Sequence, residues 1–145
     1  MAVMFLSTDG AFMAAHNSKL AAYQSVAIHG GIAADDPHQL ILMLMDGVMQ
    51  RISAARGCLE RRDLGQKAQL LQRAVAIIAE LRGSLDHQKG GALAHNLDEL
   101  YDYMARQLVR ANAENRVALL DEVASLLTEI RLAWVAVPLA LRSPP

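Results

Sequence analysis

The chain has 145 residues, of which 53% are hydrophobic and 4% aromatic, and its formal net charge at pH 7 is −1. This length can bury a core within one domain, and the near-neutral charge gives no electrostatic reason to expect a nucleic-acid partner. No apolar run reaches the roughly 20 residues of a membrane span, the first residues lack the pattern of a signal peptide, and a single cysteine suits a reducing compartment. We therefore expect a cytoplasmic protein that does not insert into membranes.

The N-terminal part of the chain shows little periodicity. Residues 1–15 have no clear hydrophobic period, and we expect this segment to be disordered. Residues 16–28 carry a weak helical pattern that includes Tyr23 and Val26, and a pair of glycines ends it. A helix of this length is marginal by itself, so we expect it to persist only when it docks onto the rest of the chain.

The first long helix is predicted from Pro37 to about Glu60. Asp36 can accept hydrogen bonds from the free amides of the first turn, and proline suits the first helical position. A core stripe recurs at steps of three and four residues: Ile41, Leu44, Met45, Val48, Ile52, Ala55 and Leu59. Other apolar or small residues lie off this stripe: Leu40, Leu42, Met43, Gly47 and Met49. The first half of this helix is therefore apolar around most of its circumference.

The next two helices are predicted on either side of a glycine turn. The first begins near Asp63, and the residues on its stripe are Leu71, Ala74, Ile78, Leu81 and Leu85. Its pattern closes at Asp86, and Gly90-Gly91 can supply the positive φ that ends a helix without steric strain. The second continues to about Asn112, and one of its faces carries Leu93, Leu97, Leu100, Tyr101, Met104, Leu108 and Ala111.

The last helix is predicted from about Arg116 to Val137, before Pro138 stops it. Its stripe consists of Leu120, Val123, Leu127, Ile130, Trp134 and Val137, and a second strip beside it consists of Leu119, Leu126 and Ala133. Short loops between long helices favour antiparallel neighbours. We therefore predict an all-α fold, an antiparallel up-down four-helix bundle with a short N-terminal helix. It forms one domain over residues 16–137, and residues 138–145 form a tail.

The sequence offers no pattern typical of catalysis or metal binding. The histidines form neither a His-Glu-x-x-His zinc motif nor the repeated Glu-x-x-His pairs of a di-iron bundle, and no phosphate-binding glycine loop is present. His95 and Glu99 form an ordinary surface pair one helical turn apart, and Cys58 is typical of a small apolar core residue. We expect Asp86 and His87 to lie in the last turn of a helix as C-terminal caps. The prediction is a protein with no cofactor and no catalytic residues, which is not an enzyme.

Two other functions remain open at this point. Histidine phosphotransfer bundles carry a phosphorylated histidine with lysine and glycine three and four residues later, whereas here Lys89 and Gly90 follow His87 one residue too close. The other alternative is a scaffold bundle that self-associates, as a homodimer for example, through surplus apolar faces. Phosphate incorporation at His87 would identify a histidine phosphotransfer protein. A measurement of mass in solution would identify a self-associating scaffold.

Apolar or small residues that lie off the core stripes can have two roles. They are Leu40, Met43, Gly47, Tyr103, Val109, Leu119 and Leu126. A bundle core wider than a narrow stripe would account for them. Alternatively, they line a groove for amphipathic partner segments, and adaptable methionine side chains suit such a surface.

Several segments, in order and at matching spacing, resemble the flagellar secretion chaperone (FliS) family. They are Tyr23 with Val26, Pro37-x-x-Leu40-Ile41-x-Met43-Leu44-x-Asp46-Gly47, Ile77-Ile78-x-Glu80-Leu81, Ser84-Leu85-Asp86, Gly90-Gly91, Leu100-Tyr101-x-Tyr103, Ala111-Asn112 and Arg131-x-Ala133-Trp134. The chain departs from the family where Asp36 replaces the serine before the first long helix and Met45 replaces the tyrosine before Asp-Gly.

The resemblance implies a cytoplasmic chaperone that binds the disordered C-terminal segment of flagellin and prevents premature polymerisation. It also implies that the chaperone delivers flagellin to the gate of the flagellar type III export apparatus. Together with the off-stripe positions, it gives the expected partner-binding residues: Tyr23, Val26, Leu40, Met43, Gly47, Tyr101, Tyr103, Leu108, Asn112, Leu119 and Leu126.

Overall fold

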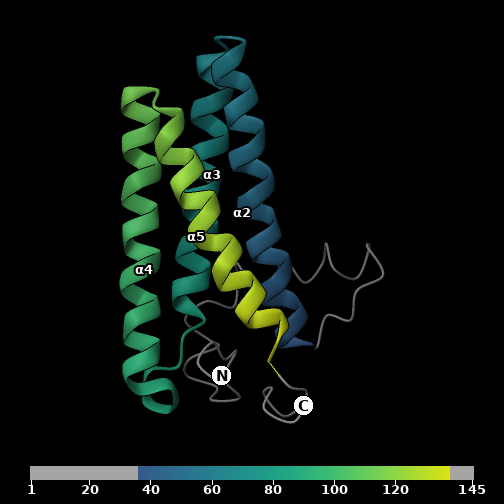
Figure 1. Ribbon diagram of the computed structural model, residues 1–145, viewed down its shortest axis with the longest axis vertical. Helices are drawn as coiled ribbons and strands as arrows, with labels where there is room; N and C mark the ends of the chain where they lie inside the picture. Colours follow the sequence, from purple (N-terminus) through teal and green to yellow (C-terminus); the bar gives the residue numbers. More distant parts are fainter. Residues whose placement is uncertain (1–35, 138–145) are drawn as a thin grey trace.

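The computed structural model describes residues 36–137, which form four helices (Figure 1). They are α2 (Pro37–Glu60), α3 (Leu64–Gly83), α4 (His87–Glu114) and α5 (Val117–Val135). The helices alternate in direction, and α2 and α4 each pack against both α3 and α5. The predicted all-α bundle is confirmed. The predicted disordered segment, N-terminal helix and tail, with Tyr23 and Val26, lie outside the described residues.

The first two described helices begin where they are predicted, each after an aspartate that caps its first turn. Asp36 accepts a hydrogen bond from the Gln39 amide at 3.1 Å, and Pro37 occupies the first turn. Asp63 accepts one from the Gln66 amide at 3.2 Å. Each carboxylate thus satisfies an amide that has no partner inside its own helix.

The connection between α3 and α4 differs from its prediction. Asp86 accepts hydrogen bonds from the amides of Gln88 and Lys89, so it caps the start of α4 and not the end of α3. The preceding helix has already closed at Ser84, whose hydroxyl donates to the Leu81 carbonyl at 2.6 Å. The prediction that Asp86 and His87 lie in a last turn is wrong, because an aspartate that precedes free amides is a stronger start signal than a stop signal.

The prediction that Gly90-Gly91 form the turn between two helices is wrong, because α3 ends at Gly83 and Gly91 lies inside α4, although it has the predicted positive φ. Its φ of 54° and ψ of −129° interrupt the helix one turn after its start. A side chain at such angles is strained even where there is room for it, and a Cβ on Gly91 would meet no atom within 4 Å. Backbone strain alone therefore decides the effect of a substitution.

We expect Gly91→Ala to lower the free energy of unfolding by about 1–2 kcal/mol. The matched control is Gly65→Ala in α3, where a Cβ also meets nothing within 4 Å and φ is not positive. That change should be neutral or should stabilise by up to about 1 kcal/mol. Urea denaturation measures the free energy of unfolding of both variants. Equal losses in the two variants would contradict the backbone strain that we assign to position 91.

The predicted stripe residues are buried or packed against the core, with two exceptions on α4. Leu97, Tyr101, Met104, Leu108 and Ala111 are buried, whereas Leu93 and Leu100 are 39% and 37% exposed. The prediction that all seven share the core face is wrong for these two, because α5 crosses the bundle obliquely (Figure 1). It lies beside the end of α4 and diverges from the first half of that helix, which contains Leu93 and Leu100.

Polar contacts join the helices around this core. Arg82 of α3 holds Asp98 and Asp102 of α4, with its Nε 2.9 Å from Asp98 Oδ1. Arg131 Nε of α5 lies 2.7 Å from Asp46 Oδ1 of α2. The hydrogen bond from Arg82 outweighs partial burial and lowers the pKa of Asp98. These pairs set the alignment of neighbouring helices, while burial of the apolar stripes provides most of the stability.

Candidate partner-binding surface

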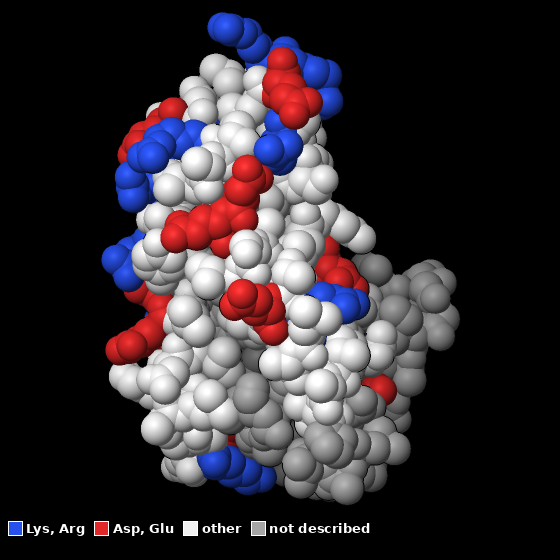
Figure 2. All heavy atoms as spheres, viewed as in Figure 1, with Lys and Arg blue, Asp and Glu red and all other residues white. Residues whose placement is uncertain are grey.

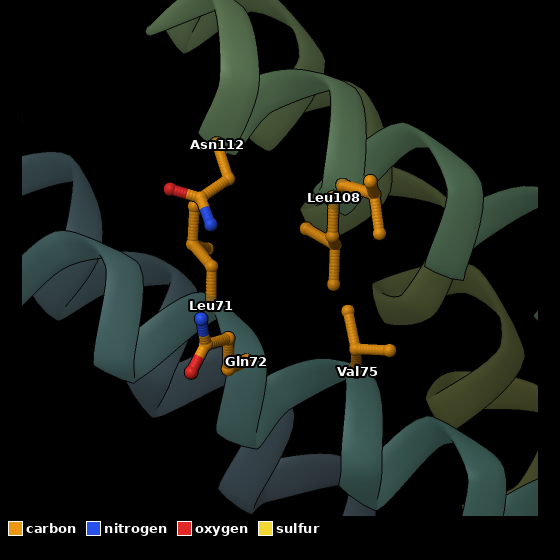
Figure 3. Close-up of a pocket in the computed structure, with 6 residues that line it drawn as sticks. Leu71, Gln72, Val75, Leu108 and Asn112 are labelled. Carbon is orange, nitrogen blue, oxygen red and sulfur yellow. The ribbon is translucent and has the colours of Figure 1, made fainter.

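A hollow opens between α3 and α4, with a volume of about 280 Å³ (Figure 3). Its lining residues are Leu71, Gln72, Val75, Leu108, Val109 and Asn112. Leu71 and Leu108 belong to the buried core and form its floor, whereas Val109 at the rim is 58% exposed. A partner side chain placed here would meet apolar atoms that are already held rigidly in the core.

Helical periodicity explains why these side chains converge. Leu71 and Val75 are one turn apart on α3, and Leu108 and Asn112 are one turn apart on α4. Because the helices are antiparallel and in contact, the two pairs face each other. Figure 3 shows Val75 and Leu108 together at one end, and Gln72 and Asn112 at the other. The hollow is therefore apolar at one end and carries amide donors and acceptors at the other.

The end of α4 beside this hollow is fixed by a buried lysine. Lys67 Nζ donates to the Asn112 carbonyl oxygen at 2.8 Å and to Asn115 Oδ1 at 2.6 Å. Asn115 ends α4 in the left-handed conformation with a φ of 54°. Lys67 thus satisfies a carbonyl of the last turn and favourably opposes the negative end of the helix dipole. The amide end of the hollow is held in a fixed position as a result.

The predicted partner-binding residues lie in several places. Leu108 and Asn112 line the hollow. Leu40, Tyr101 and Leu119 are enclosed in the core. Tyr101 lies on the predicted α4 stripe, and a core wider than the stripes accounts for Leu40 and Leu119. Burial raises the pKa of the Tyr101 phenol above its ordinary value.

The remaining predicted residues within the described range are half-buried and lie on α2, α4 and α5. Met43 and Gly47 lie on α2, where Gly47 approaches Ile77 of α3, and Leu126 packs on the core from α5. The structure does not bring these residues together with the hollow, which α3 and α4 alone enclose.

Tyr103, which lies off the α4 stripe, has a structural partner. Its hydroxyl donates to Glu122 Oε2 of α5 at 2.7 Å, and Gln107 Nε2 donates to Glu122 Oε1 at 3.0 Å. The hydrogen bond to the carboxylate raises the pKa of Tyr103, and the bonds from Gln107 and Tyr103 lower the pKa of Glu122. This contact joins α4 to α5 near their connection, which explains a tyrosine at this position.

Three residues of the hollow were missing from the predicted site: Gln72, Val75 and Val109. Val109 was recognisable as an apolar residue off the α4 stripe, whereas Gln72 and Val75 carry no such signal. Periodicity identifies the buried face of each helix but not which neighbour borders it. The α3 side of the hollow could not be found without the packing.

The described residues contain no group of three or more His, Cys, Asp or Glu that could hold a metal ion. His87 is exposed at the first position of α4, unlike the mid-helix histidine of phosphotransfer bundles. His95 forms the predicted surface pair with Glu99 at 3.1 Å, and Cys58 is a buried free thiol. Within residues 36–137, no helix is both long and apolar enough to cross a membrane.

Comparison with known proteins identifies the family. Residues 19–140 match the family described as flagellar protein FliS. The chain is 46% identical over 112 residues to the flagellar secretion chaperone FliSB of Pseudomonas aeruginosa, covering 77% of this chain and 89% of that protein. It is 42% identical over 118 residues to the flagellar secretion chaperone FliS of Salmonella typhimurium, covering 81% of this chain and 87% of that protein. It is 35% identical over 119 residues to the flagellar secretion chaperone FliS of Vibrio cholerae, covering 82% of this chain and 88% of that protein. The chain therefore belongs to the flagellar secretion chaperone family FliS.

Proposed function

We propose that this chain is a cytoplasmic flagellar export chaperone whose substrate is the disordered C-terminal segment of flagellin. By covering that segment it prevents premature polymerisation, and it delivers the subunit to the gate of the flagellar type III export apparatus. Family membership supports the general role. The observation that carries the binding mode is the hollow between α3 and α4, where exposed Val109 stands over a core floor.

The hollow suits a segment that folds as it binds. An amphipathic helix can insert an apolar side chain between Val75 and Leu108, while Gln72 and Asn112 hydrogen-bond to its polar groups. The segment loses conformational entropy when it becomes ordered, which offsets part of the favourable contact energy. The complex therefore remains releasable at the export gate, and the protein acts by binding and not by catalysis.

Calorimetric titration of the full chain with the C-terminal segment of flagellin from the same organism tests this function. We expect one-to-one binding with a dissociation constant below about 1 µM and a negative heat-capacity change from apolar burial. Absence of binding to the folded protein would contradict the proposal. Mass in solution, measured on the same sample, would then decide whether the chain is instead a self-associating bundle.

A further inference from the structure

A second groove lies on the outer seam between α2 and α3, with a volume of about 390 Å³. Unlike the hollow beside α4, its walls are polar and basic. Arg51 and Arg73 line it together with three glutamines, Gln50, Gln66 and Gln69. None of these residues belongs to the hollow that we propose for flagellin.

The packing of α2 on α3 places the two arginines opposite each other. A Cβ on Gly47 would lie 3.4 Å from Ile77 Cδ1, so these two positions are in contact. Arg51 lies one turn after Gly47 on α2, and Arg73 lies one turn before Ile77 on α3. Because the helices are antiparallel, the step from Gly47 to Arg51 and the step from Ile77 back to Arg73 run in the same direction in space. The two arginines therefore lie on opposite sides of the groove.

Neither cation is neutralised within the described part of the chain. Arg51 Nη1 donates to the Gly47 carbonyl oxygen at 3.1 Å, and the ion pairs among residues 36–137 involve other arginines, such as Arg56 and Arg82. The surrounding residues 50–73 hold six of the fourteen Lys and Arg but only two of the fifteen Asp and Glu. Figure 2 shows several Lys and Arg at the upper end of the molecule, where α2 joins α3, with acidic side chains beside them.

We propose that this groove binds an acidic helical segment of a partner protein. Two arginines that line one groove from α2 and from α3 can each hold a carboxylate through paired hydrogen bonds, and the glutamines supply further donors and acceptors. Ala54 and Leu70 also line the groove, and the small alanine leaves room for a helix to lie along the seam. The occupant is therefore a helix with glutamates on one edge and small apolar residues beside them.

A nucleic acid suits this groove less well. No aromatic side chain lines it, so bases would find no stacking surface. Outside residues 50–73 the chain carries thirteen of its fifteen acidic residues against eight of its fourteen basic ones, which would repel an extended polyanion.

The groove and the hollow use different faces of α3. Leu71 and Val75 face α4, whereas Gln66 and Arg73 face the outer seam with α2. A protein bound in the groove therefore need not displace a segment bound in the hollow, and the two interactions can be measured separately.

Fluorescence anisotropy tests the proposal with the full chain and a labelled acidic helical peptide. The peptide has about 18 residues, or roughly five turns, with glutamates one turn apart on one edge and alanine and leucine beside them. The variant is Arg51→Gln with Arg73→Gln. The control is Arg106→Gln with Arg110→Gln, which removes the same charge from exposed positions on α4.

We expect the Arg51 and Arg73 double variant to bind the peptide at least about tenfold more weakly, and the control to bind within about twofold of the parent chain. Binding to the parent should weaken as NaCl rises from about 50 to 500 mM. Thermal unfolding of each variant verifies that it is folded. No peptide binding, equal losses in both double variants, or equally tight binding of single-stranded DNA of the same charge would overturn the proposal. Unchanged affinity of the Arg51 and Arg73 variant for the flagellin segment would show that the groove is distinct.

Discussion

Trp134→Ala should lower the free energy of unfolding by about 3–5 kcal/mol, the largest stability effect that we expect from one substitution in this chain. Trp134 is buried near the end of α5, where its ring stacks on His38 of α2 with the ring centroids 4.8 Å apart. Its Nε1 donates to the His38 carbonyl oxygen at 3.0 Å, and His38 Nε2 donates to the Trp134 carbonyl oxygen at 2.8 Å. Removing the indole leaves a cavity and removes the ring stacking and one hydrogen bond that join α5 to α2.

Milder variants separate these contributions. Trp134→Phe keeps an aromatic ring but removes the indole N–H, and we expect it to lose about 1–2 kcal/mol. Leu132→Ala is the control on the same helix, and because Leu132 is 64% exposed its effect should stay within about 0.5 kcal/mol. Urea denaturation measures all three. A Trp134→Ala loss below about 1.5 kcal/mol would show that this contact does not hold α5 in place.

Val109→Glu should weaken binding of the flagellin segment at least about tenfold while the fold remains intact. The valine is exposed in the free protein, so the new carboxylate stays in water and costs little stability before the partner binds. In the complex the same group would be enclosed beside the apolar floor of the hollow, and no Lys or Arg is among the residues that line the hollow. Calorimetric titration measures the affinity, and thermal unfolding measures the stability.

Leu132→Glu provides the matched control for this experiment. It places the same charge on another exposed apolar residue, on α5 and outside the hollow. We expect its affinity for the segment to stay within about twofold of the parent chain. If both variants bind as the parent does, the flagellin segment does not enter the hollow. If Leu132→Glu alone weakens binding, the outer face of α5 is the binding surface.

Local sequence determined the helices and most of their buried faces. Asp36 with Pro37 and Asp63 carry the capping chemistry in their own side chains, so the starts of α2 and α3 could be predicted without any tertiary contact. Apolar residues at helical spacing identified the core, because a bundle must bury one stripe of each helix. The same short patterns, in order, carried the family resemblance, which the comparisons confirmed.

Only the tertiary structure decided which of those faces meet and where they separate. Leu93 and Leu100 have the period of core residues, yet the oblique path of α5 leaves them partly exposed, because helix crossing depends on packing along the whole interface. The hollow needs Val75 of α3 beside Leu108 of α4, and the basic groove needs Arg51 of α2 opposite Arg73 of α3. Periodicity gives the direction in which each side chain points from the axis of its helix. The assembly of the helices decides which neighbouring helix lies in that direction.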